Sequence, residues 1–164
     1  MSGTPVSRDW TTSMLVKGDG SVRKTCHNTS LIIANHSSLA GKLGYNEMTA
    51  ANEIDGTPVD EIMVSRLREL IEVEYGYTPS KDDVSDSINR AARERTYHPV
   101  RQYLAGLAWD GVERLSYVAS DYFSAHGTLY SELVRRWMIS AVARAYRPGC
   151  KVDCALILVG PQGA

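Results

Sequence analysis

The end of the chain carries the feature that most constrains its fold. Residues 152–159, VDCALILV, form a short apolar run, and a glycine-rich turn, GPQGA, follows at residues 160–164. A phosphate-binding loop has this layout, in which a buried strand leads into the pattern GxxxxGK[ST] and then into a helix. Spacing alone leaves an ordinary turn as the alternative, because Pro and Gly mark both. The candidate nucleotide-binding residues are Gly160, Pro161, Gln162, Gly163 and Ala164.

The amino-acid composition limits the classes of protein to which this chain can belong. The chain has 164 residues with 18 basic and 19 acidic side chains, so any binding of nucleic acid has to come from a local patch. Its three cysteines include no CxxC pair, which favours a reducing cytoplasm over a disulfide framework. The N-terminus lacks the pattern of a secretory leader, and the longest apolar run, 155–159, is too short to span a bilayer. We therefore expect a cytoplasmic protein with no membrane partner.

Helical signals dominate the rest of the chain. Asp60 is placed to cap a helix that Gly76 ends, and Ser80 to cap the next one. A hairpin is expected from Lys42–Glu47 and Asn52–Ile54, before a turn at Asp55-Gly56. The pattern predicts a mainly α fold with a small β component. The expected helices cover residues 27–36, 60–75, 80–95, 99–107, 115–122 and 128–146.

The expected organisation has three parts. Residues 1–24 are rich in Ser, Thr and Gly and are expected to be a weakly ordered lead-in. Residues 25–96 would form an accessory module whose helix–hairpin–helix–helix order is loosely similar to a winged helix. Residues 97–164 would begin a second domain, in which Thr128 caps the longest helix. The core stripe expected on that helix consists of Leu129, Leu133, Trp137, Ala141 and Ala145, widened by Val134, Met138 and Val142.

Basic side chains near the end of that helix are candidate contacts to nucleic-acid phosphates. They are Arg135, Arg136, Arg144, Arg147 and Lys151. The alternative is a solvated helix face whose cations complement the helix dipole. The same two interpretations apply to Arg90, Arg93 and Arg95. Cys150 and Cys154 lie four apart but have no further ligand nearby, and no metal site or catalytic constellation is expected.

Several spaced motifs resemble one known family. YHPVRQYL at residues 97–104, LAWDG at 107–111, RPGCK at 147–151 and GPQGA at 160–164 resemble the virulence-associated protein E family. The resemblance spans about residues 24–164 and includes Asn28, Gly44–Glu47 and Tyr75-Gly76, while Gln102 stands where the family more often has an acid. These phage- and island-encoded proteins carry a P-loop ATPase module similar to replicative helicases.

The resemblance implies an ATP-dependent DNA helicase or ATPase of replication. The complete protein would use ATP and magnesium, act on DNA and form a ring-shaped homo-oligomer. The Walker A lysine, the Walker B acid, the sensor residues and any arginine finger would lie beyond Ala164. The resemblance therefore carries only residues 160–164 over as nucleotide-binding, and these 164 residues are not expected to be catalytically competent.

A second hypothesis is that the chain is a truncated remnant that binds DNA or a partner protein without catalysis. Under either hypothesis, a parallel strand at 152–159 needs neighbours that the chain does not obviously supply. We expect this segment to be exposed or frayed rather than central in a sheet.

Overall fold

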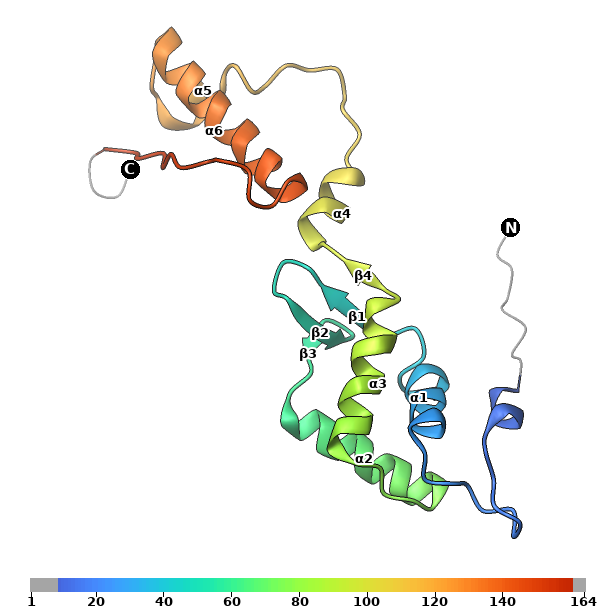
Figure 1. The fold of residues 1–164 in the computed structure, drawn as a ribbon. Coiled ribbons are helices and arrows are strands. Elements are labelled where there is room, and N and C mark those ends of the chain that lie inside the picture. Colours follow the sequence, from blue (N-terminus) through green and yellow to red (C-terminus); the bar gives the residue numbers. More distant parts are fainter. Residues whose placement is uncertain (1–8, 161–164) are drawn as a thin grey trace. The chain divides into compact units, whose positions relative to one another are not determined.

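The computed structural model describes residues 9–160, and it divides the chain into two compact units. The first unit reaches to Pro99 and the second begins at Val100. Six α-helices, one short 3-10 helix and four short strands make up the described elements (Figure 1), so the predicted mainly α fold with a small β component is confirmed.

Three helices of the first unit have ends within one or two residues of the predicted ranges. They are α1 (Cys26–Asn35), α2 (Glu61–Tyr75) and α3 (Lys81–Arg93). The Asp60 side chain accepts a hydrogen bond from the Met63 N–H at 2.7 Å, and Ser80 caps α3 in the same way. Gly76 ends α2 with φ of +72°, a left-handed conformation that glycine adopts without steric cost.

The hairpin is also confirmed, within a four-stranded sheet that has two strands more than the expected pair. Strands β1 (Leu43–Asn46) and β2 (Ala51–Ile54) pair antiparallel, and a tight turn at Asp55-Gly56 leads to β3 (Thr57–Pro58). Both turn residues have positive φ, as a type I′ hairpin turn requires. The strand order is β3-β2-β1-β4, and β4 (Thr96–Tyr97) pairs parallel with β1.

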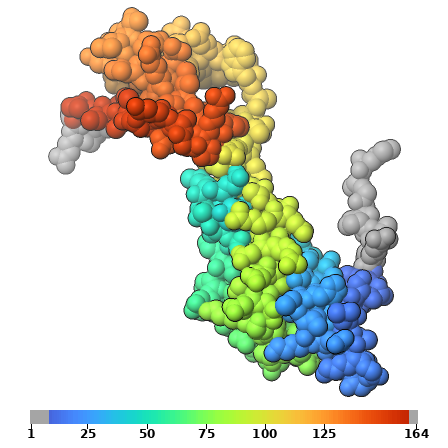
Figure 2. Space-filling view, in the orientation of Figure 1, coloured from blue at the N-terminus to red at the C-terminus, as the bar shows by residue number. Residues whose placement is uncertain are grey.

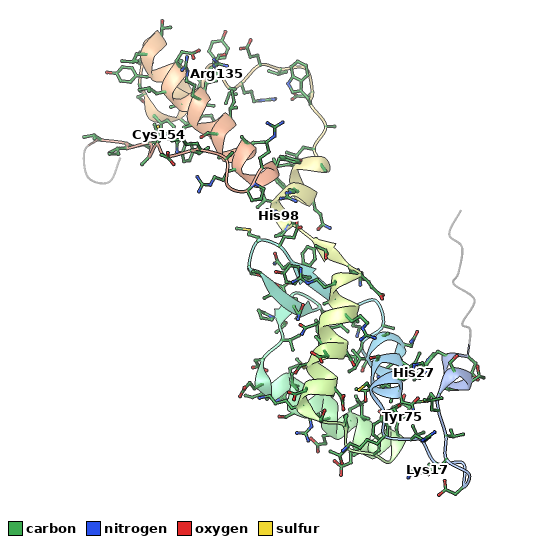
Figure 3. All side chains as sticks on the ribbon, in the orientation of Figure 1. Lys17, His27, Tyr75, His98, Arg135 and Cys154 are labelled. Atoms are coloured by element: carbon green, nitrogen blue, oxygen red, sulfur yellow. The ribbon has the colours of Figure 1, made fainter. Side chains whose placement is uncertain are left out.

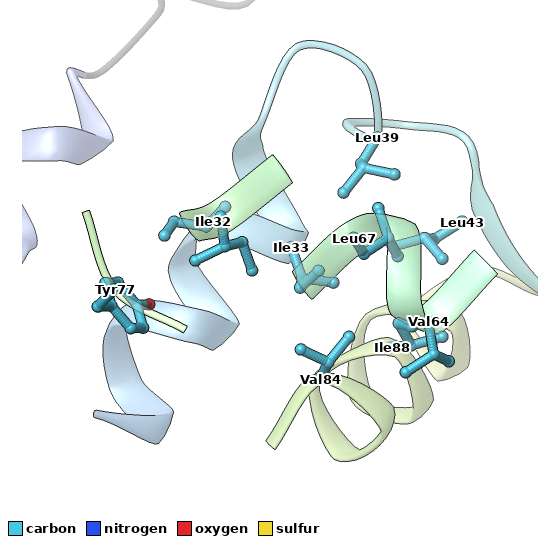
Figure 4. Packing of buried hydrophobic residues seen from close by; sticks show 10 residues of the cluster. Ile32, Ile33, Leu39, Leu43, Val64, Leu67, Tyr77, Val84 and Ile88 are labelled. Atoms are coloured by element: carbon cyan, nitrogen blue, oxygen red, sulfur yellow. The ribbon is translucent and has the colours of Figure 1, made fainter. Parts of the chain in front are cut away.

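The hydrophobic core of the first unit lies between its helices. Ile32 and Ile33 of α1 and Ile71 of α2 are completely buried, and α1 packs mainly on α3 (Figure 4). The buried residues of α2, which are Val64, Leu67 and Ile71, repeat at helical spacing and so lie on one face. The remaining members of the cluster are Leu39, Leu43, Val64, Leu67, Tyr77, Val84 and Ile88.

Residues 9–24 have defined structure, which differs from the expected weakly ordered lead-in. A 3-10 helix covers Trp10–Ser13, and Val16 and Val22 form an isolated antiparallel bridge. Trp10, Met14 and Val22 pack against the core, and this segment lies against α1 in Figure 2. Composition did not show this because the anchor is Asn28, a side chain of the following helix.

The second unit contains α4 (Pro99–Ala105), α5 (Val118–Phe123) and α6 (Thr128–Tyr146). The bounds of α6 match the prediction, but the N-cap position is Gly127, which offers no side-chain bond, so Thr128 is not the cap. The predicted burial of the α6 stripe is wrong: Val134 is the only buried residue that this helix contributes. Leu129, Leu133 and Trp137 are 67, 50 and 40% exposed. Among the described residues, α5 is the one element with substantial packing on α6.

Candidate functional site

The segment that leads to the glycine turn is extended and exposed. Residues 151–160 form no strand and lie outside the sheet, which confirms the expectation that this segment is exposed or frayed rather than central in a sheet. Ile157, Leu158 and Val159 are 79, 59 and 94% exposed. The physical reason is the one that the sequence suggested, since no described strand pairs with the segment to complete a hydrogen-bonded ladder.

The start of this segment is held by the end of α6. The Arg144 Nη1 donates to the Val152 carbonyl oxygen at 2.9 Å, and the Cys150 N–H donates to the Arg147 carbonyl at 3.0 Å. Gly149 adopts φ of +86° in the turn between them, which glycine allows. The RPGC stretch therefore stops the helix, as predicted, and directs the chain back along it.

The candidate phosphate loop itself is only partly described. Gly160 is exposed, and a Cβ added to it would meet no atom within 4 Å. The other candidates, Pro161, Gln162, Gly163 and Ala164, lie outside the described residues.

The cationic candidates on α6 do not share one face. Arg135 and Arg144 are nine residues apart, which puts them on opposite sides of a helix at about 100° per residue. Arg135 donates to both Glu132 oxygens at 3.0 Å, and Arg136 also pairs with Glu132, at 3.3 Å (Figure 3). The hydrogen bonds from Arg135, and to a smaller extent from Arg136, lower the pKa of the Glu132 carboxyl, so this group stays charged.

Arg147 and Lys151 complete the predicted set, and both are exposed. Neither forms an ion pair with a described residue. The cations toward the C-terminal end of α6 are thus more available to an anion than Arg135 and Arg136, whose charges Glu132 offsets.

The WDG stretch forms a local bend held by hydrogen bonds. Asp110 accepts from the Val112 N–H at 3.0 Å and from both terminal nitrogens of Arg114, at 2.9 and 2.5 Å. The hydrogen bonds from Arg114 are the main reason that the pKa of the Asp110 carboxyl is lowered. The Trp109 indole donates to the Val112 carbonyl and remains 80% exposed. Arg114 was missed from the sequence, although its i,i+4 spacing to Asp110 was the available signal.

A buried carboxylate in the first unit was also missed. Glu53 on β2 is 5% exposed and accepts hydrogen bonds from the Tyr97 hydroxyl and from the Asn46 amide. The hydrogen bond from Tyr97, and to a smaller extent that from Asn46, lowers the pKa of Glu53. The same hydrogen bond to Glu53 raises the pKa of Tyr97. The group joins β1, β2 and β4 across the sheet. No local pattern predicts it, because Tyr97 is 44 residues away in sequence.

The cysteines and acids give no sign of metal chemistry in residues 9–160. Cys26, Cys150 and Cys154 are free thiols, and Asp83 raises the pKa of the Cys26 thiol through a hydrogen bond. No group of three His, Cys, Asp or Glu side chains in this range could hold a metal ion. None of the helices described there is long and apolar enough to cross a membrane.

One comparison with known proteins bears on these motifs. The family model of the virulence-associated protein E-like domain matches residues 104–164. The match takes in the WDG turn, α6, the RPGCK stretch and the glycine turn, whereas most of YHPVRQYL precedes it. No curated protein matches the chain. Residues 104–164 are therefore similar to the virulence-associated protein E-like domain.

Proposed function

We propose that the second unit belongs to an ATP-dependent DNA helicase or ATPase that acts in replication, and that residues 160–164 begin its phosphate-binding loop. The observation that carries the proposal is the order of features within the family match. A helix, the turn at Gly149, an exposed apolar segment and the glycine-rich sequence GPQGA follow one another from residue 128 to residue 164. ATP and magnesium would be the cofactors, and the active form would be a homo-oligomer.

The exposed segment supports this proposal on physical grounds. A phosphate loop needs a strand to hold it and free backbone N–H groups that converge on the phosphates. Residues 155–159 are apolar and extended, and they have no described strand partner, so their backbone groups are available for pairing. The Arg144 bond to Val152 fixes where the segment begins. The open space around Gly160 would let a phosphate approach its backbone closely.

The first test is to read the coding DNA directly after the codon for Ala164. The proposal expects Gly-Lys-Ser or Gly-Lys-Thr, which would complete the GxxxxGK[ST] pattern. A stop codon there would refute the proposed loop.

The second test measures DNA-stimulated ATP hydrolysis by the protein with its following residues included. Gly160→Val should abolish hydrolysis because the added side chain would occupy the space that a phosphate needs. The same change should leave folding intact, since nothing lies within 4 Å of the added Cβ. Gly106→Ala is the matched control, because its Cβ would make only ordinary contacts at 3.5 Å or more. A folded wild-type protein without DNA-stimulated hydrolysis would contradict the proposal.

DNA is the proposed partner of the second unit through Arg136, Arg144, Arg147 and Lys151. Arg135 is the weakest of the five candidates because it lies opposite Arg144 and both Glu132 oxygens bind it. The expected interaction is with phosphates and does not depend on base sequence.

A second candidate function is DNA binding by the first unit without catalysis. It is favoured by one specific observation, which is that residues 9–99 enclose their own hydrophobic core and carry a set of exposed arginines at the end of α3. Salt-dependent binding that survives in the absence of nucleotide would support it.

A further inference from the structure

Three arginines without ion pairs stand at the C-terminal end of α3. Arg90 and Arg93 lie in its last turn, and Arg95 follows two residues after the helix. All three are exposed, and none forms an ion pair with a described residue. The other charged residues in reach along the chain are Asp86 and Glu94, each four residues from Arg90, and neither pairs with it.

The turn before β1 brings further groups to the same place, where α3 ends beside β1 and β4 (Figure 1). The Arg93 guanidinium lies over the Tyr45 ring, 3.6 Å from its centroid. The Arg95 Nη1 is 3.7 Å from the point where a Cβ on Gly41 would stand. Lys42 lies between Gly41 and Tyr45 in sequence. Its Nζ is 3.7 Å from Asp55 Oδ2, in an exposed ion pair. Two segments about fifty residues apart in sequence therefore lie side by side, and Lys42 is next to Gly41 in the earlier of them.

The helix dipole accounts for only part of this arrangement. Cations in the last turn of a helix are favoured by its negative end, and Arg90 and Arg93 fit that explanation. Arg95 lies beyond the last turn, and Lys42 belongs to another segment, so the dipole does not explain their presence. The contrast with α6 is informative, because there Glu132 pairs with both Arg135 and Arg136.

We propose that Arg90, Arg93 and Arg95, with Lys42, bind the phosphodiester backbone of nucleic acid. The inference rests on the DNA partner of the proposed function and places a contact surface on the first unit. Guanidinium groups present planar donor pairs that match phosphate oxygens, and they are weakly hydrated. Tyr45 is a positioning residue, because its ring holds the Arg93 guanidinium in place. The surface reads no base edges, so binding is independent of sequence.

Acidic side chains elsewhere in the first unit restrict where a nucleic acid can bind. Asp82, Asp83 and Asp86 lie toward the N-terminal end of α3, and α2 carries Glu61, Glu69, Glu72 and Glu74. A phosphate chain would be repelled from these regions and attracted to the α3 C-terminus. Binding therefore depends on a few contacts and is steeply sensitive to salt.

The test uses the whole 164-residue chain and fluorescence anisotropy of a labelled oligothymidylate and of a labelled duplex, measured from low to rising salt. The triple variant Arg90→Ala, Arg93→Ala, Arg95→Ala should weaken binding by about tenfold or more at low salt. The slope of log K against log salt for the single strand should fall by about 2, from three lost phosphate contacts. Tyr45→Leu should weaken binding in the wild-type chain but not in a chain that already carries Arg93→Ala.

Matched controls separate this surface from general charge. Arg66→Ala removes one exposed cation from α2 of the same unit and should leave binding unchanged. Arg144→Ala with Arg147→Ala tests the cations of α6 in the same assay. Thermal unfolding followed by circular dichroism should show that every arginine variant remains folded, since these exposed side chains make only single surface contacts such as those of Arg93 with Tyr45 and Arg144 with Val152. An unchanged affinity in the α3 triple variant would overturn the inference.

Two further outcomes are decisive. Binding of polyglutamate with the same affinity and the same dependence on the α3 arginines would overturn the assignment to nucleic acid in favour of an acidic protein. DNA binding that needs these arginines, in a protein that shows no ATP hydrolysis when its following residues are included, would refute the proposed ATPase and leave this inference standing. ATP hydrolysis with no loss of DNA binding in the α3 triple variant would refute this inference and leave the proposed ATPase standing.

Discussion

Asn28→Ala should destabilise the first unit by about 2–4 kcal/mol, because one buried amide holds residues 9–24 to the core. Asn28 on α1 is completely buried. Its Oδ1 accepts from the Leu15 N–H at 2.9 Å, and its Nδ2 donates to the carbonyls of Leu15 at 2.7 Å and Arg23 at 2.8 Å. All three bonds join residues that are five or more positions apart in sequence.

The magnitude follows from these three bonds. Each contributes about 1 kcal/mol net, and a backbone group left buried and unpaired costs about 1–3 kcal/mol. The upper limit is set by the segment itself, because it can move away from α1 and let water reach the freed groups. That movement would then expose Trp10, Met14 and Val22, which now pack against the core.

The assay is urea unfolding of the whole chain followed by circular dichroism, combined with hydrogen exchange of the Leu15 amide. We expect a lower unfolding midpoint and loss of protection at Leu15 in the Asn28→Ala variant. Asn35→Ala is the matched control, since that amide donates only to the Leu31 carbonyl one turn earlier in the same helix. A change in unfolding free energy below about 0.5 kcal/mol, with Leu15 still protected, would refute the reasoning.

Two further predictions concern a helix end and a buried acid. Gly76→Ala should lower the unfolding free energy by about 1 kcal/mol because φ is +72° there, whereas Gly18→Ala, with no positive φ and no neighbour within 4 Å, should have little effect in the same urea titration. Hydrogen bonds from Tyr97 and Asn46 hold the pKa of Glu53 below its usual 4.5. Its contribution to stability is therefore complete above pH 4.5 and is lost as the pH falls through the lower folded value, so urea midpoints of Glu53→Gln should converge on those of the wild type in acid. A constant gap between the two proteins at every pH would contradict this prediction.

The elements of the first unit could be predicted from sequence because their signals are local. Asp60 and Gly76 mark the two ends of α2 within sixteen residues, and Ser80 does the same for the start of α3. The Asp55-Gly56 turn needs no distant residue either, since two positive φ values suffice to fold the hairpin back.

What the sequence did not predict depends on residues that are far apart along the chain. The parallel pairing of β4 with β1 joins Tyr45 to Thr96, and the buried acid Glu53 finds its donor in Tyr97. Neither partner carries a pattern that identifies the other. The α3 arginines are a similar case, since their composition was visible in the sequence, whereas the contact of Arg93 with Tyr45 appears only in the fold.

The comparison of α2 with α6 shows why periodicity predicts a helix better than it predicts burial. Both helices repeat apolar residues at helical spacing, and both begin and end close to the expected positions. In α2, Leu67 and Ile71 are buried because other elements of the first unit pack over that face. In α6, Leu133 and Trp137 have the same spacing but remain 50 and 40% exposed, because the described residues cover little of the helix beyond Val134. Helical spacing is a property of one segment, whereas burial is a property of two, so an apolar stripe predicts a core only where a second surface packs against it.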